Sequence, residues 1–304
     1  MKKQTGNHAR PDTHNFSRAR TARRPGVHFP LWLASVFAAW LLCAPEAVAQ
    51  GELTPLQQAV RTQAARLSSA EVEERRDAVM RLGAMARPEA SRAAAPALSD
   101  SAAVVRATAA RAVLSLGAVD ASALILPLLR DRDEFVRREA AYALGMTRST
   151  AGMEALVAAL GADKQASVRG AAAVALGQIG APASVPALSA ALTRRFPATG
   201  FFGRLRRRKV EEDEFVRRAV AVSLGQIGGR EGVPVLIEAL SDERAPGDVR
   251  REAARSLGLI GDPAATPALR GVLTHHDPYL AQTAFEALRR IDPPSATRPA
   301  GVKL

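Results

Sequence analysis

The 304-residue sequence predicts an all-α fold, an α-solenoid of about six helix-turn-helix repeats with a capping helix at each end. Three observations predict it. Six arginines recur at intervals of 31 to 33 residues, apart from one interval of 48: Arg75, Arg106, Arg137, Arg169, Arg217 and Arg250. A leucine follows each of these anchor arginines after 23 residues. Within each copy, apolar residues step by three and four, which is typical of one face of a helix.

The first 49 residues indicate an export signal with a long basic leader. Residues 31–43 are apolar, and the small-residue motif Ala47-Val48-Ala49 follows them. This order is typical of a cleaved bacterial signal. The apolar run is shorter than the roughly 20 residues of a membrane-spanning helix. We therefore expect a periplasmic or secreted protein. The alternative is an inner-membrane anchor formed by an uncleaved 31–43 segment.

Residues 50–69 predict an N-terminal capping helix, with Thr54 as its N-cap and Pro55 in its first turn. Residues 70–292 then form the repeat solenoid. Three glycines are placed where a left-handed cap ends the first helix of a repeat: Gly180, Gly228 and Gly261. Three prolines begin the second helix of the same repeats: Pro186, Pro234 and Pro267. Asp277 caps the last helix, and residues 293–304 are expected to be a disordered tail.

An insertion at 193–212 explains the single long interval between anchor arginines. It combines seven basic residues with three of the nine phenylalanines of the chain. We regard nine of its residues as a candidate docking loop: Arg194, Arg195, Phe201, Phe202, Arg204, Arg206, Arg207, Arg208 and Lys209. Such a loop could meet an acidic protein or an anionic membrane surface, whereas the export signal makes nucleic acid an unlikely partner. The alternative is a surface loop whose basic run pairs with Glu211 and Glu214 close by.

Composition gives little support for catalysis or metal binding. The formal charge is +12, but seven of the 42 basic residues lie in the first 49 positions. Cys43 is the only cysteine, so cleavage after Ala49 would leave no thiolate ligand. His275 and His276 lack the further ligands that a metal needs. We therefore expect no metal and no cofactor.

The repeat resembles the HEAT repeat, and within that group the PBS-lyase HEAT-like repeat of bacteria, over residues 70–291. The sequence VRGAAAVALGQIG at 168–180 is its clearest copy, and the hexapeptide DEFVRR occurs at both 133–138 and 213–218. The resemblance implies that the anchor arginines and nearby aspartates cap helices and join repeats. The aspartates in question are Asp100, Asp133, Asp163, Asp213 and Asp248.

The resemblance also leaves two functions open. The first is a non-catalytic scaffold that binds another protein, through the insertion or through the second helices of the repeats. On those helices four variable polar residues are candidates for contact: Arg92, Glu154, Glu238 and Arg270. The second is an enzyme or enzyme auxiliary, similar to a bilin lyase subunit or to deoxyhypusine hydroxylase. The hydroxylase uses His-Glu dipeptides as iron ligands, and this sequence has none. We therefore favour the scaffold.

Overall fold

The computed structural model describes residues 53–197 and 209–295, which contain fourteen α-helices. Six of these are the first helices of successive repeats: α3 (Val72–Ala84), α5 (Ala103–Ala112), α7 (Glu134–Thr147), α9 (Ala166–Ile179), α12 (Glu214–Ile227) and α14 (Gly247–Ile260). Six are their partners: α4 (Pro88–Ala94), α6 (Ala118–Ile125), α8 (Met153–Ala162), α10 (Val185–Leu192), α13 (Val233–Ser241) and α15 (Thr266–Gly271). Helix α2 (Pro55–Arg66) precedes the repeats and α16 (Pro278–Ile291) follows them. This is the predicted all-α solenoid of six repeats.

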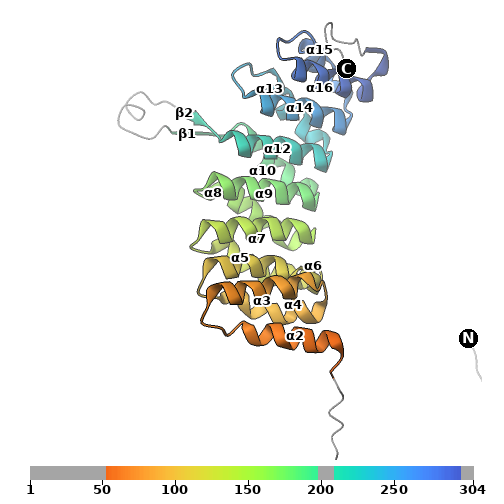
Figure 1. Cartoon of the computed structure of the whole chain (residues 1–304). Helices are drawn as coiled ribbons and strands as arrows, with labels where there is room; N and C mark the ends of the chain where they lie inside the picture. Colours follow the sequence, from red (N-terminus) through yellow and green to blue (C-terminus); the bar gives the residue numbers. More distant parts are fainter. Residues whose placement is uncertain (1–52, 198–208, 296–304) are drawn as a thin grey trace, which may run out of the picture. The chain divides into compact units, whose positions relative to one another are not determined.

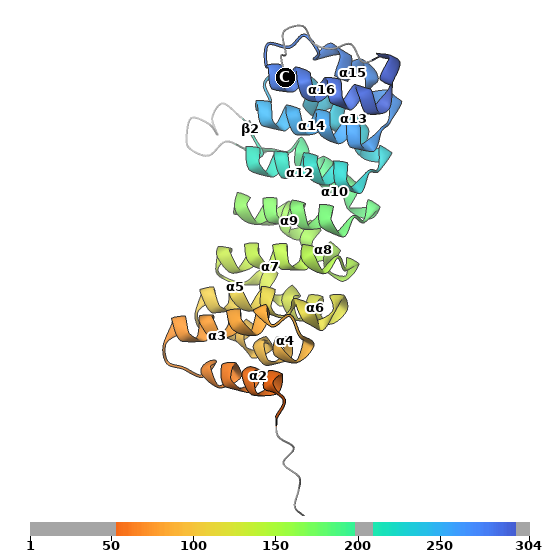
Figure 2. The same ribbon diagram turned by 45° about the vertical axis from the view of Figure 1, so that its right-hand side comes forward.

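The helices of residues 53–295 stack in chain order (Figures 1 and 2). Each first helix packs against the first helices of the repeats before and after it, from α3 through α16. The second helices also pack on the first helix of the following repeat, as α8 does on α9 and α13 on α14. Each repeat therefore contacts its neighbours and little else, which is the nearest-neighbour arrangement of a solenoid.

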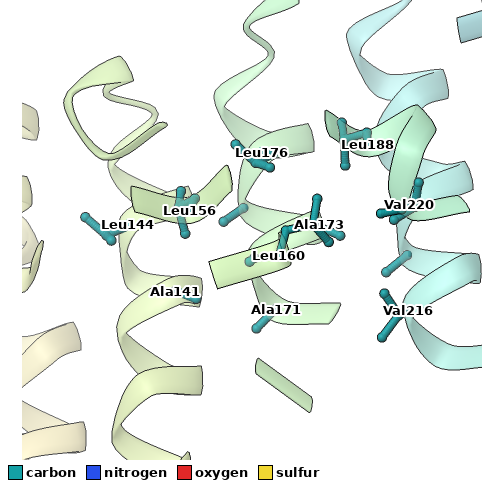
Figure 3. Packing of buried hydrophobic residues seen from close by; sticks show 14 of the residues in the cluster. Ala141, Leu144, Leu156, Leu160, Ala171, Ala173, Leu176, Leu188, Val216 and Val220 are labelled. Carbon is teal, nitrogen blue, oxygen red and sulfur yellow. The ribbon is translucent and has the colours of Figure 1, made fainter. Parts of the chain in front are cut away.

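Small aliphatic side chains form one continuous core (Figure 3). The residue seven positions after each anchor arginine is buried in all six repeats: Leu82, Val113, Leu144, Leu176, Leu224 and Leu257. Alanines fill the space between them; Ala141 and Ala171 lie on facing first helices, and both are buried. Alanine lets paired helices approach closely, while each buried leucine contributes about 2 kcal/mol.

The helix ends follow the signals in the sequence. Gly180, Gly228 and Gly261 have φ values of 72, 77 and 74°, and each ends a first helix in the left-handed region as predicted. The third repeat instead ends α7 at Arg148, a non-glycine residue with φ of 54°. Thr54 caps α2 and forms a capping box with Gln57, which confirms the predicted start of that helix.

The second helices of the first two repeats end earlier than those of later repeats. Helix α4 passes into the 3-10 segment η1 (Ala95–Ser99), and α6 passes into η3 (Leu126–Arg130). Pro96 and Pro127 are the cause, because a proline beyond the first turn removes an α-helical hydrogen bond. In α10, α13 and α15 the proline lies in the first turn, where its missing N–H costs nothing.

Several expected segments lie wholly or partly outside the described residues. The export signal at 1–49, with its apolar segment 31–43, is one of them. Within 53–197 and 209–295, no helix is long and apolar enough to cross a membrane. The expected disordered tail begins at 293, but Pro293–Ser295 form a 3-10 turn, η8, directly after α16. The two prolines restrict φ to values that suit such a turn.

Candidate functional site

The insertion begins and ends as a β-hairpin, where the sequence analysis expected a loop. Strand β1 (Arg195–Pro197) pairs antiparallel with β2 (Lys209–Glu211), so that Phe196 faces Val210 and Arg195 faces Glu211. Both cross-strand pairs suit an antiparallel ladder, one apolar and one of opposite charge. The two strands extend away from the row of helices beside α12 (Figure 1).

The base of this hairpin is fixed to the solenoid by buried polar contacts. Glu212 follows β2, is fully buried as a side chain, and accepts hydrogen bonds of 2.6 and 3.0 Å from Arg169 of α9. Arg194 precedes β1 and donates to the backbone carbonyl of Leu160 at 2.8 Å. The Phe196 ring lies 5.2 Å from the guanidinium of Arg169 and 5.9 Å from that of Arg194. Because a buried charge that loses its partner is costly, these contacts hold the hairpin in place.

The structure places some of the nine docking-loop residues and not others. Arg194 is turned into the base of the hairpin and serves a structural role there. The Arg195 side chain is 59% exposed and lies 3.4 Å from Glu211. Lys209 begins β2. The other six lie outside the described residues: Phe201, Phe202, Arg204, Arg206, Arg207 and Arg208.

The four candidate residues of the second helices are all exposed. Arg92 lies on α4, Glu154 on α8, Glu238 on α13 and Arg270 on α15. Arg270 lies 3.6 Å from Asp292, so its charge is partly neutralised within the chain. These residues are on equivalent helices of different repeats and are not gathered into one site.

The anchor arginines form a ladder of contacts between repeats. In the first three rungs, Nε and Nη2 of the arginine donate to the two oxygens of one aspartate located 25 or 26 residues later. The pairs are Arg75–Asp100, Arg106–Asp131 and Arg137–Asp163, with Nε to oxygen distances of 2.7 Å. The Nη1 group of each donates to two backbone carbonyls that precede its own helix. The hydrogen bond from Arg106 lowers the pKa of Asp131 below its usual value.

The sequence analysis predicted that arginines and aspartates join repeats, and these contacts confirm it. It also predicted that Asp133 and Asp213 cap helices, and both accept from the first turn of the helix that follows, α7 and α12. It missed Asp131 as the partner of Arg106. Asp248 caps nothing, since α14 has Pro246 at its N-cap, and it pairs with Arg218 and Arg251 instead.

The fourth, fifth and sixth rungs are altered by the hairpin and by His275. Arg169 takes Glu212 as its carboxylate. Arg217 donates to Glu211 at 2.5 Å through Nη1. Arg250 meets the imidazole of His275 at 3.0 Å where the other rungs have an acidic residue. The first-turn acceptor of α16 is Asp277, as predicted.

A cavity of about 230 Å³ lies at the base of the hairpin, between the fourth and sixth repeats. It was not foreseen from the sequence, because its walls come from α10, the two strands, α12 and α13. Charged side chains of both signs line it: Arg194, Arg195, Glu211, Arg217, Glu238 and Asp242. Glu238 is the one second-helix candidate that lies beside the docking loop.

An apolar groove of about 520 Å³ lies over the first helices of the first three repeats. Met80 of α3 and Met146 of α7 line it with half of their surface exposed, and Phe135 lies between them. Arg76 and Arg111 add positive charge at the groove. Within the described part of the chain, no three metal-ligating side chains converge.

Comparison with known proteins agrees with this architecture. The Escherichia coli protein YibA has a similar structure, with a TM-score of 0.55 and 19% identity over 77% of this chain and 81% of that one. The complex of CpcE and CpcF of phycocyanin lyase from Nostoc gives a TM-score of 0.45 and 24% identity, over 81% and 97% of the two chains. Human deoxyhypusine hydroxylase gives 0.35 and 24%, over 78% and 96%. At these identities the likeness concerns the fold alone, and no curated protein matches the chain.

Sequence profiles of repeat families cover most of the described residues. The profile of HEAT repeats matches residues 60–145, 122–198 and 243–299, which is more than half of the chain. The profile of the PBS lyase HEAT-like repeat matches residues 216–242, the repeat that follows the hairpin. Together with six stacked helix pairs and a ladder of inter-repeat ion pairs, these matches show that the chain belongs to the HEAT-repeat family.

Proposed function

We propose that this protein is a non-catalytic scaffold that binds another protein outside the cytoplasm. The observation that carries the proposal is the mounting of the hairpin. A tolerated insertion needs only to leave the stack undisturbed. Here the residues that flank the insertion replace a rung of the ladder, with Glu212 buried against Arg169. The solenoid thereby holds two strands out from its side in one position, which reduces the entropy lost when a partner binds.

The charge of the hairpin defines the chemistry of that partner. Residues 193–212 contain seven arginines and lysines and two glutamates, which gives 7 − 2 = +5. A segment with this charge attracts acidic surfaces and raises the rate of encounter with them. An acidic protein is the partner we propose, and an anionic membrane surface is the alternative that the experiment must separate from it.

Two further surfaces support a binding role. The exposed second-helix residues lie on successive repeats, as in an extended contact face. The groove beside Met80 and Met146 exposes apolar side chains, and contiguous apolar surface on a folded protein is typical of an interaction site. Methionine is adaptable enough to fit more than one partner.

The test is affinity purification of the intact chain from the cell envelope, compared with a variant that lacks residues 198–208. An Asn-Gly turn joins the two strands in that variant, because this dipeptide suits a two-residue hairpin. The variant keeps Arg194, Phe196 and Glu212, so the anchoring contacts remain. We expect the partner to be lost with the segment. A partner identified by mass spectrometry is then mixed with the purified chain to confirm direct binding.

Two controls separate the alternatives. Vesicles of phosphatidylcholine, with and without phosphatidylglycerol, show whether an anionic lipid surface alone accounts for the loss. The double variant E154R/E238R tests the second-helix face with the hairpin intact. Unchanged partners in the hairpin variant would contradict a docking role for the hairpin. Stoichiometric iron in the purified chain would contradict the non-catalytic role.

The proposed location has its own test. N-terminal sequencing of the protein recovered from cells should begin at Gln50 if the signal is cleaved. Substitution of Ala47 and Ala49 by aspartate should abolish that cleavage. An intact N-terminus in the membrane fraction of wild-type cells would instead favour an anchor formed by residues 31–43.

A further inference from the structure

The fifth rung of the ladder is incomplete. In the first three rungs and in Arg169, the Nε and Nη2 groups donate together to the two oxygens of one carboxylate. Arg217 is 5% exposed, as buried as those arginines, and it occupies the equivalent position on α12. Its Nε atom is buried and has no hydrogen-bond partner. Asp242, 25 residues later, is the acceptor expected from the period, but it lies 4.0 Å from Nη2, beyond hydrogen-bond distance.

The hairpin explains why this rung is open. In the first four rungs, Nη1 donates to two backbone carbonyls that precede its own helix. In Arg217 the Nη1 group donates instead to the side chain of Glu211, at the end of β2. Asp242 is meanwhile held by the backbone N–H of Arg244 at 3.0 Å. The edge of Arg217 that binds a carboxylate elsewhere in the ladder is therefore left without an acceptor, although an unpaired buried donor costs about 1–3 kcal/mol.

Arg217 also lines the cavity at the base of the hairpin. Arg195 lies on the same wall, and Glu238 and Asp242 lie on α13. The three arginines and three carboxylates of the lining balance one another formally. A planar ligand with a single negative charge suits such a site better than a phosphate dianion, because three carboxylates would repel the second charge. The four completed rungs show which planar anion this edge accepts.

We infer that the cavity binds a side-chain carboxylate of the protein partner, through Nε and Nη2 of Arg217. This inference rests on the proposed function for the source of the carboxylate. The partner's acidic residue completes the rung that Asp242 leaves open, and Asp242 and Glu238 oppose its entry by charge. The site thus combines one specific donor edge with a built-in repulsion.

The experiment observes the Nε–Hε resonance of Arg217 by NMR in the full-length chain with ¹⁵N-labelled arginine. The resonance is assigned with Arg217→Lys. The probe is hexaglutamate peptide with an amidated C-terminus, and inorganic phosphate at equal ionic strength is the control. We expect the peptide to shift the Arg217 resonance downfield and phosphate to leave it unchanged. Arg217→Lys should weaken peptide binding at least about tenfold, because lysine cannot offer two parallel donors.

Two neutralising variants give a result that a merely structural role would not. Asp242→Asn and Glu238→Gln each remove a like charge from the cavity, and each should tighten hexaglutamate binding by about fivefold. Arg106→Lys is the matched control, since it alters a completed rung far from the cavity and should leave peptide binding unchanged. The thermal melt of each variant checks that it remains folded.

Three outcomes would overturn the inference. One is an Arg217 resonance that the peptide does not move and that Asp242→Asn does move, which would assign the edge to Asp242. Another is peptide binding that survives in Arg217→Lys, which would locate the contact elsewhere on the basic segment. The third is equal binding of phosphate. In each case the co-purification experiment still decides the proposed function, because it does not depend on Arg217.

Discussion

At the scale of single residues, the buried guanidinium groups are the most demanding feature of this chain. Each completed rung has four or more hydrogen bonds around one arginine, so no donor faces the apolar core. The ion pair itself adds little net stability, because both charges lose their hydration on burial. Removing one partner is expensive for the same reason. The ladder therefore acts as a constraint on how successive repeats stack.

Arg106→Lys tests this constraint. A lysine keeps the charge but cannot donate to both oxygens of Asp131 and to the carbonyls of Asp100 and Ser101 at once. We expect a loss of about 3 kcal/mol in the free energy of unfolding, measured by urea denaturation. The exposed ion pair between Arg76 and Glu73 is the control, and Glu73→Gln should change stability by less than about 1 kcal/mol. Equal effects would contradict a special role for the rungs.

His275 is the residue whose contacts cannot all be satisfied. Its Nε2 faces the Arg250 guanidinium at 3.0 Å, and its Nδ1 faces the backbone N–H of Asp277 at 3.1 Å. Both neighbours are donors, while a neutral imidazole has only one acceptor nitrogen. Desolvation, and then the charge of Arg250, lower the pKa of His275. An aspartate could accept from both donors, as Asp131 does in its rung.

We therefore expect His275→Asp to stabilise the chain by about 1 kcal/mol at pH 7. The same substitution should remove a pH dependence. A histidine with a lowered pKa binds fewer protons in the folded state than in the unfolded state, so stability falls as the pH drops below about 6.5. Urea denaturation at pH 7.5 and 5.5 measures both effects. A wild-type chain that is equally stable at the two values would refute this account of His275.

The ladder also shows what residue patterns could and could not predict. Spacing predicted that arginines and aspartates join the repeats. It did not predict Asp131 as a partner, because attention fell on Asp133, which caps α7. The separation of 25 or 26 residues between an anchor arginine and an acidic residue was a usable signal. The unpaired Nε of Arg217 had no signal in the sequence, since it depends on how the hairpin positions Glu211.

At the scale of helices, close approach between first helices depends on glycine at a few positions. A Cβ added to Gly145 of α7 would lie 2.7 Å from the Cα of Ala175 in α9. A Cβ added to Gly258 of α14 would meet Ala287 of α16 at the same distance. Backbone atoms cannot move aside without moving a whole helix. These glycines therefore set the spacing of the stack.

Gly145→Ala should destabilise the chain by about 1–3 kcal/mol, because the extra methyl group forces α7 and α9 apart. Gly161→Ala is the matched control. Gly161 also lies in a helix, α8, but a Cβ there would meet nothing within 4 Å. That substitution should stabilise the chain by up to about 1 kcal/mol, through the loss of backbone freedom in the unfolded state. Thermal unfolding followed by circular dichroism measures both, and shifts of the same sign would contradict the argument.

The helices were predictable at this scale and the hairpin was not. Helical periodicity extends over ten or more residues in each first helix, and glycine and proline mark the ends. The strands have three residues each, which is too short for an alternating pattern to be recognised. Their pairing is decided by tertiary contacts, above all by Phe196 against two guanidinium groups and by burial of Glu212. Sequence could locate the insertion but could not reveal its anchoring.

At the scale of the whole stack, stability should be distributed along the chain as in a one-dimensional array. A central first helix such as α9 has neighbours on both sides, and nine of its fourteen residues are buried. The two end helices differ from each other. Helix α16 buries five residues against α14, whereas α2 has no buried residue. A nearest-neighbour model then predicts fraying from the N-terminal end first.

Hydrogen exchange measured by mass spectrometry should therefore show the strongest protection in α7, α9 and α12. Protection should be lower in α16 and lowest in α2. Deletion of residues 53–66 should cost less than about 1 kcal/mol, since it uncovers little of α3 beyond the sites of Val60 and Leu67. Deletion from 277 onward should cost several kcal/mol, because Leu257 and its neighbours on α14 lose their cover. Equal protection of all helices, lost in one step, would show that the stack unfolds as a single unit and that the nearest-neighbour description fails.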